Sequence, residues 1–264
     1  MFLQAMRMMR RDWRAGELYF LLLALVVAVA ALSSVGFFID RLAAGLDRDA
    51  NQLLGADLVI NADQPVSEDW RAEARRRGLR LAETVSFPSM ALAGEGDAAR
   101  SRLTSIKAVS AGYPLRGQVR VADRAGGTDM AAHAIPAPGT VWVDPDVLAA
   151  LGVAPGEQLQ LGEMRFRIDK VIAIEPDRGS AFINFAPRVM LGLPDLAATH
   201  LVQDGSRVTY RLLVAGPPPQ VKPFQQWVEA QIGAANMRGV RIESLESGRP
   251  EMRTTLDRAH QFLS

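Results

Sequence analysis

Two carboxylates and a guanidinium group share one short segment of this sequence, Glu175-Pro176-Asp177-Arg178-Gly179. Paired carboxylates can act as a general acid and a general base. The segment also has a simpler interpretation, because Pro-Asp-x-Gly is typical of a turn and Arg178 can pair with an acidic neighbour. We favour the turn, and we therefore predict that neither Glu175 nor Asp177 is catalytic.

The histidines do not have the spacing of a metal site. His133, His200 and His260 lie far apart in the sequence, and we expect them on loops or on helix surfaces. The chain contains no cysteine, which excludes disulfides, cysteine-ligated metals and thiol nucleophiles. The sequence therefore predicts no metal site and no cofactor-binding residue.

The common nucleotide-binding and hydrolase motifs are absent. There is no G-x-x-x-x-G-K-[ST], so the chain does not bind ATP through a P-loop, and neither H-E-x-x-H nor G-x-S-x-G occurs. The run Arg75-Arg76-Arg77 could contact an acidic partner, but we favour the simpler interpretation, the solvated C-terminal end of a helix. We predict that the chain is not an enzyme.

Charge and length restrict the remaining classes of protein. The chain has 264 residues, with 30 Lys and Arg against 29 Asp and Glu. This balance gives no indication of a nucleic-acid partner. The length suffices for one large domain or two small ones with a hydrophobic core.

An uncharged apolar stretch covers residues 18–39. As a helix it would be roughly 33 Å long, enough to cross a hydrocarbon core of about 30 Å. Four arginines precede it, at positions 7, 10, 11 and 14, so we place the N-terminus in the cytoplasm and the rest of the chain outside it. A cleaved signal peptide is the alternative, but the stretch exceeds the usual apolar region of about 7–15 residues.

Amphipathic segments flank this predicted transmembrane helix. In residues 1–17, Phe2, Met6, Met9 and Trp13 share one helical face and the arginines another, as in a helix lying at the inner membrane interface. An unstructured basic leader that only sets topology is the alternative. Apolar residues continue at helical spacing through residues 40–54, which we interpret as a stalk helix that ends at Gly55.

The exported region, residues 55–249, alternates strand and helix patterns and predicts an α+β fold. Helices are expected at 67–77, 144–151 and 220–232, each beside a capping or terminating residue or with one apolar face. Residues 123–139, rich in Gly, Pro and Ala, predict a long loop or a subdomain boundary. The expected strands are 56–61, 79–92 broken by Pro88, 101–110, 141–143, 158–161, 164–168, 171–174, 182–190, 207–215 and 240–242.

The last residues predict a second stalk. Pro250 can open a helix, and Met252, Leu256, Ala259 and Leu263 follow on one face of it. The pattern is still running at Ser264. We interpret residues 250–264 as a helix returning toward the membrane, with a second transmembrane helix missing from this sequence.

Segments distributed along the chain resemble one family in their order and composition. They are Arg14–Leu18, the apolar helix, Leu54–Leu58, Phe87–Met90, Lys107–Val109, Gly112–Gly117, Glu175–Arg178, Ala186–Met190, Gly205–Arg207, Tyr210–Leu213, Leu256–Ala259 and Phe262-Leu263. Together they resemble the YbbP-like branch of the FtsX/MacB-type ABC transporter permeases. Each motif alone is weak, whereas the ordered set is fairly specific.

The resemblance implies a subunit of the bacterial inner membrane with a MacB-like periplasmic domain, built from two α/β subdomains, after the first membrane helix. It implies a cytoplasmic ABC ATPase subunit as partner, the remaining permease helices, membrane lipids, a periplasmic partner and a lipid-like or hydrophobic substrate. Relatives of this branch have many more membrane helices. The sequence thus corresponds to an N-terminal part of such a permease.

Two other classes of protein remain open from the residues alone. A single-pass periplasmic sensor or scaffold without transport activity would explain the single apolar helix. A membrane-tethered hydrolase has no supporting motif. Further apolar segments downstream of Ser264 and an adjacent ATPase gene would favour the permease.

Overall fold

The structure is a computed structural model that describes residues 23–31, 33–34, 37–38, 41, 54–96, 99–178, 186–203 and 205–244. The chain divides into two compact units, Met1–Asp49 and Ala50–Ser264. The described residues of the first unit are helical, and the guanidinium of Arg41 lies 5.5 Å from the ring centre of Phe37. Among all the residues that the structure describes, no helix has the length and apolar character needed to cross a membrane.

Several predictions concern residues that lie wholly or largely outside this description. They are the amphipathic segment 1–17, the stalk 40–54, the returning helix 250–264 and the N-terminal half of the expected strand 182–190. The transmembrane helix at 18–39 is described only in part. These assignments stay predictions.

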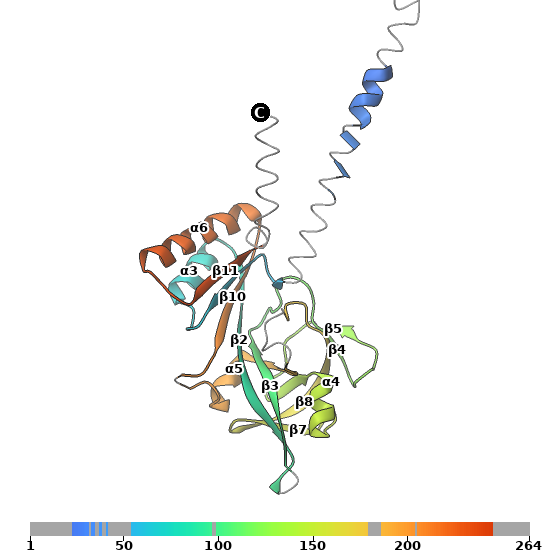
Figure 1. The fold of residues 1–264 in the computed structure, drawn as a ribbon, viewed down its shortest axis with the longest axis vertical. Helices are drawn as coiled ribbons and strands as arrows, with labels where there is room; N and C mark the ends of the chain where they lie inside the picture. Colours follow the sequence, from blue (N-terminus) through green and yellow to red (C-terminus); the bar gives the residue numbers. More distant parts are fainter. Residues whose placement is uncertain are drawn as a thin grey trace, which may run out of the picture. The chain divides into compact units, whose positions relative to one another are not determined.

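The second unit is built on one mixed sheet of 11 strands (Figure 1). Its order is β11-β1-β10-β2-β3-β9-β6-β8-β4-β5, with β7 pairing with β2 and β8. The strands are β1 Leu58–Ala62, β2 Arg80–Ala93, β3 Arg100–Val109, β4 Arg120–Ala122, β5 Met130–Ala131, β6 Thr140–Val143, β7 Gln158–Leu161, β8 Met164–Ile174, β9 Arg188–Gly192, β10 Thr209–Ala215 and β11 Val240–Ser244.

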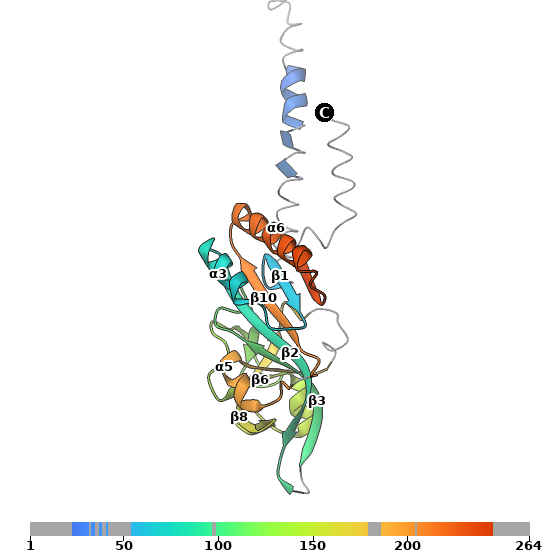
Figure 2. The ribbon, with the colours of Figure 1, turned by 90° about the vertical axis from the view of Figure 1, so that its left-hand side faces the viewer.

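A long antiparallel hairpin, β2–β3, runs through the middle of this sheet and projects at the end away from α3 and α6 (Figures 1 and 2). The predicted break at Pro88 is wrong, because β2 continues through it and Pro88 pairs with Ser105 of β3. On the other edge of β2, the partner β10 ends its pairing at Ser86 and β7 begins its pairing at Ala91. Proline is tolerated there because its missing N–H faces no partner strand.

Two helices cover one face of the sheet at the β11-β1-β10 end, as Figure 2 shows. Helix α3, Glu68–Arg76, begins after Ser67, whose hydroxyl accepts a bond from the Asp69 N–H at 3.2 Å. Helix α6, Pro218–Ala234, packs Phe224 and Val228 into the same core as Trp70. Both helices were predicted, within a few residues at each end.

A second core lies toward the other end of the sheet, beneath α4, Pro145–Leu151. The predicted end of this helix at Gly152 is confirmed by its left-handed backbone, with φ 65°. The predicted hairpin at 158–168 is β7–β8, which turns at Gly162. Missing from the predictions are β4, β5, and two short helices after β9: α5, Leu193–Leu196, and the 3-10 helix Ala197–Thr199.

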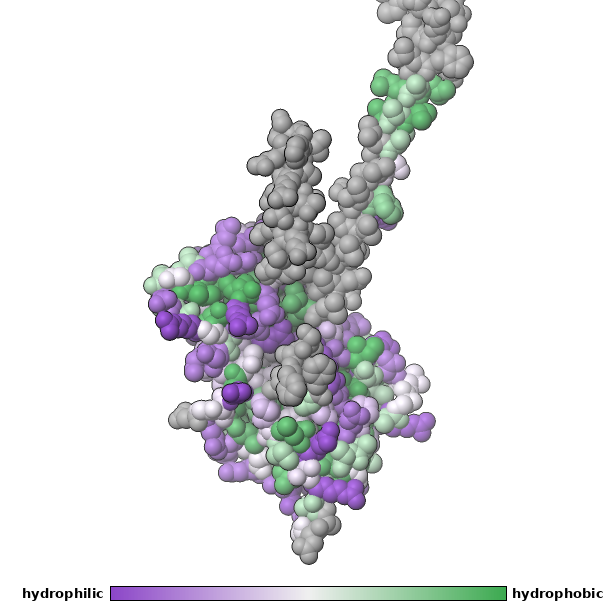
Figure 3. All heavy atoms as spheres, in the orientation of Figure 1, coloured by the Kyte–Doolittle hydropathy of each residue, from purple (hydrophilic) through white to green (hydrophobic). Residues whose placement is uncertain are grey.

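A third apolar cluster, around Trp142, Tyr113 and Met190, lies on the sheet face opposite α3 and α6. On the face of the second unit drawn in Figure 3, polar and apolar residues are mixed and the apolar ones form small groups. The four exposed large apolar side chains of the strands are Met90, Leu103, Met130 and Ile174. Met90 lies directly opposite Leu103 in the β2–β3 hairpin, whereas Met130 and Ile174 pair with adjacent residues of β4.

Candidate functional site

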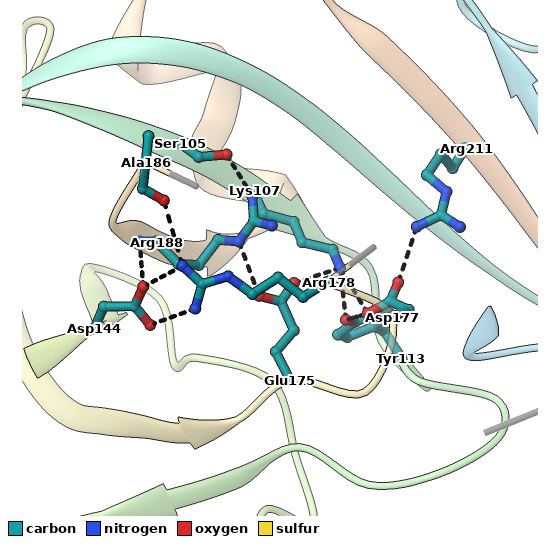
Figure 4. A network of polar contacts seen from close by, with 10 residues as sticks. All are labelled: Ser105, Lys107, Tyr113, Asp144, Glu175, Asp177, Arg178, Ala186, Arg188 and Arg211. Carbon is teal, nitrogen blue, oxygen red and sulfur yellow. Dashed lines mark hydrogen bonds and ion pairs between the residues drawn. The ribbon is translucent and has the colours of Figure 1, made fainter. Parts of the chain in front are cut away.

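A buried ammonium group is at the centre of the most unusual site in the second unit (Figure 4). Lys107 lies on β3 with its side chain only 2% exposed. Its Nζ lies 2.7 Å from the hydroxyl of Tyr113, 2.7 Å from Glu175 Oε1 and 2.8 Å from Asp177 Oδ1. A lysine is almost never buried this fully unless it is paired, and here both carboxylates are fully buried as well.

Glu175 connects Lys107 to a second buried cation. The Nε of Arg188, at the start of β9, donates to Glu175 Oε2 at 2.9 Å. A terminal nitrogen of Arg188 donates to the hydroxyl of Ser105 on β3. The carboxylate of Glu175 thereby joins the residue after β8 to β3 and β9, which are neighbours of each other in the sheet.

Asp177 connects the same lysine to β10. One of its oxygens accepts from Lys107 and from the hydroxyl of Tyr113, and the other accepts from Arg211 at 3.0 Å. Arg211 also donates from Nε to Asn61 Oδ1 on β1. Asp177 is thus held from β3, from the loop that follows β3 and from β10.

Asp144 continues the cluster at its edge. Its carboxylate accepts two bonds from Arg178, at 3.2 and 2.7 Å, and one from the backbone N–H of Arg188 at 2.7 Å. Asp144 directly precedes α4, so this pair anchors the start of that helix to the turn after β8. We call the group Ser105, Lys107, Tyr113, Asp144, Glu175, Asp177, Arg178, Arg188 and Arg211 the buried charge network.

The network determines the protonation of its acids. Burial alone would raise the pKa of Glu175, but Lys107 and Arg188 outweigh it and hold that pKa below its ordinary value. The pKa of Asp177 is likewise lowered, because Lys107 and Arg211 outweigh its burial. Burial and the charge of Asp177 raise the pKa of Tyr113 well above its ordinary value.

Both carboxylates stay ionised near neutral pH, so neither is an available general acid, and their side chains have no contact with solvent. A network of this kind joins strands in one fixed arrangement, because each charge is satisfied only there.

The predicted turn at residues 175–179 is confirmed at Pro176-Asp177. However, the two carboxylates of that segment point into the protein, and Arg178 pairs with Asp144, 34 residues away in the sequence. The sequence analysis missed Lys107, Arg188 and Arg211. Arg188 and Arg211 each directly precede an apolar run, and Lys107 lies between Ile106 and Ala108. A cation beside apolar strand residues is the signal that could have revealed them.

The other residues considered from the sequence lie apart from the network. His133 and His200 are exposed on loop or turn positions, and His260 lies outside the described residues. Arg75 pairs with Glu68, whereas Arg76 and Arg77 pair with Glu73. The described part of the chain holds no cluster of His, Cys, Asp and Glu that could bind a metal ion.

Comparison with known proteins places these observations in a family context. No protein-family model matches the chain. An uncharacterized ABC transporter permease of Escherichia coli K12, YbbP, is 29% identical over 253 residues, which are 96% of this chain and 30% of that protein. This chain therefore spans less than a third of the relative, and the resemblance seen in the motifs is confirmed.

Solved structures also resemble the chain, at low sequence identity. The periplasmic region of MacB from Actinobacillus actinomycetemcomitans is 9% identical, with a TM-score of 0.47, covering 78% of this chain and 95% of that one. The extracellular domain of the transporter YknZ from Gram-positive bacteria is 9% identical, with a TM-score of 0.42, covering 71% and 100%.

Proposed function

We propose that this chain, a relative of the YbbP-like branch of the FtsX/MacB-type ABC transporter permeases, is an N-terminal part of a permease subunit. The observation that carries the proposal is the similarity to YbbP over 96% of the chain. In this proposal, the remaining membrane helices, the ATPase-coupling loops and the translocation path are contributed by other parts of the permease.

In this proposal, residues 18–39 cross the inner membrane with the N-terminus in the cytoplasm, and residues 55–249 form the periplasmic domain. The uncharged stretch and the four preceding arginines support this topology. The two ends of the sheet, one covered by α3 and α6 and the other by α4, are the proposed α/β subdomains.

The proposed partner is a cytoplasmic ABC ATPase, and the proposed cargo is a lipid-like or hydrophobic molecule. ATP hydrolysis by the partner would displace the periplasmic domain as a rigid body. The buried charge network supports rigid-body motion, because it ties β3, β8, β9 and β10 together through ionic contacts that are satisfied in one arrangement. The chain itself performs no chemistry in this scheme.

Co-purification of the complete permease with the ATPase encoded beside it tests the proposed function. An affinity tag on the permease should recover the ATPase, and the complex in lipid nanodiscs should hydrolyse ATP. A gene that stops at Ser264, with no ATPase bound to its product, would instead favour the single-pass sensor or scaffold.

The topology has a separate test. A reporter enzyme active only in the periplasm, fused after position 60, should be active, and the same reporter fused before residue 18 should not. The opposite pattern, or a mature protein that lacks its first residues, would contradict the proposed membrane orientation.

A further inference from the structure

The segment through which the chain joins the sheet, Leu54–Leu58, lies against the buried charge network. Leu54 is helical, and Gly55 follows it with a left-handed backbone, φ 73°. Ala56 is fully buried, and β1 begins at Leu58. A left-handed glycine between a helix and a strand is a natural pivot, unless neighbouring contacts hold it.

Arg116 and Asp57 supply such contacts. The Arg116 guanidinium donates to both oxygens of Asp57, at 2.8 and 2.7 Å, and its backbone N–H donates to the carbonyl of Gly55 at 2.9 Å. Asp57 also accepts from the N–H of Gly216 at 3.0 Å, and its own N–H donates to the carbonyl of Val214 at 3.0 Å. The segment is therefore held both by the loop that carries Arg116 and by the end of β10.

The loop that carries Arg116 is itself part of the network. Tyr113, three positions earlier, contacts Lys107 and Asp177 through its hydroxyl. Gly55 meets the same carboxylate directly, because a Cβ atom added there would lie 3.3 Å from Asp177 Cβ. A displacement at Leu54 thus has two short routes into the network, one through Tyr113 and one through Asp177.

We propose that the bidentate Asp57–Arg116 pair is a clasp that prevents pivoting at Gly55 and transmits displacement of the chain at Leu54 to the sheet. The inference rests on the proposed function and adds to it the residues that perform the coupling. A bidentate arginine–carboxylate pair suits this role, because its two parallel bonds fix orientation as well as distance. The pair is partly exposed, with side chains 37% and 16% accessible, so it can be changed without opening the core.

The substitution Arg116→Gln in the complete transporter tests the clasp. Arg165→Gln is the matched control, because Arg165 also pairs with a carboxylate, Glu95, at 2.8 Å on an exposed surface. Hydrogen–deuterium exchange of the loop containing Tyr113 and of β10 is measured with and without ATP, together with ATP hydrolysis. These readouts need no knowledge of the transported substrate.

Arg116→Gln should reduce the ATP-dependent difference in exchange by about two- to thirtyfold, the range found for changes in coupling networks. ATP hydrolysis, and exchange in β2 and β3 without nucleotide, should stay as in the wild type and in the Arg165→Gln control. An unchanged ATP-dependent difference would overturn the clasp. So would faster exchange throughout β2 and β3 without nucleotide, because the pair would then only stabilise the fold.

A covalent replacement provides the rescue. The chain has no cysteine, so the double variant Asp57→Cys/Arg116→Cys introduces the only thiols of this sequence. The ATP-dependent difference in exchange should be lost in this variant and should return when a short bifunctional thiol reagent links the two positions. If the difference does not return, the clasp is contradicted. If exchange in the wild-type transporter does not depend on ATP, the proposed function fails and the clasp with it. If exchange in the wild type depends on ATP and Arg116→Gln shows the same dependence, only the clasp is overturned.

Discussion

The backbone of Gly55 lies against the side chain of Asp177, so closely that a Cβ atom at position 55 would stand 3.4 Å from the carboxylate carbon. Gly55, where the chain joins the sheet, thus lies against a carboxylate that is itself bound by Lys107 and Arg211. Any side chain at position 55 would push on the carboxylate of Asp177. We expect this contact to make position 55 unusually sensitive to substitution.

Gly55→Ala tests that contact against a matched glycine. Gly126 has a similar backbone, φ 69° against 73°, but no atom lies within 4 Å of the Cβ that would be added there. Left-handed strain alone should cost both variants about 1–2 kcal/mol. Gly55→Ala should cost more than Gly126→Ala in chemical denaturation followed by tryptophan fluorescence. Equal losses would show that the contact with Asp177 is easily relieved.

Removing the central cation should destabilise the fold strongly. Lys107→Met leaves Glu175 and Asp177 buried with one cationic partner fewer, and breaking a buried pair in this way typically costs about 3–5 kcal/mol. Lys170→Met is the control, because the Lys170–Asp123 pair is substantially exposed and should contribute less than about 1 kcal/mol. A similar free energy of unfolding for the two variants would contradict the central position of Lys107.

Most elements of the fold were predicted from local patterns, whereas the network was not. Ser67 before α3, and Gly152 after α4, mark their helix ends through short-range chemistry that a sequence displays. The contact between Lys107 and Asp177 joins residues 70 positions apart, and it depends on strand order. No periodicity reveals such pairing, since an isolated cation in an apolar strand is equally compatible with an exposed edge.

The alkaline stability of the protein should depend on Tyr113. Its pKa is raised in the folded protein above the ordinary unfolded value of about 10. The neutral phenol therefore contributes stability that is present in full below pH ~10 and lost as pH rises through the folded pKa. Tyr113→Phe should flatten the fall in unfolding free energy above pH ~10, although it also removes the hydrogen bond to Asp177.

Absorbance of tyrosinate gives the independent measurement. In the wild type, part of the tyrosinate signal should appear only when the protein unfolds, and that part should be missing from Tyr113→Phe. Tyr210→Phe is the control, because Tyr210 is only partly buried. A tyrosinate signal that develops fully before unfolding in the wild type would contradict the burial of the Tyr113 hydroxyl.

In acid, the change of the unfolding free energy with pH depends on the two carboxylates of the network. The pKa values of Glu175 and Asp177 are lowered in the folded protein, against about 4.3 and 3.9 in an unfolded chain. Where folded pKa values are lowered, the unfolded state binds more protons, so the unfolding free energy decreases as pH falls. The stabilisation is complete above the unfolded values, and it is lost as pH falls below about 4 through the folded values.

Salt separates this buried contribution from that of surface pairs. The pKa of Glu68 is also lowered, chiefly by a hydrogen bond from Arg75 on α3, but these two side chains are 67% and 60% exposed. At about 1 M NaCl the Debye length is about 3 Å, so the surface contribution to the acid slope should shrink while that of Glu175 and Asp177 persists. Asp177→Asn should therefore reduce the slope that remains at high salt, whereas Glu68→Gln should reduce only the slope at low salt. If Asp177→Asn leaves the high-salt slope unchanged, the carboxylate of Asp177 does not titrate as a buried, ion-paired group.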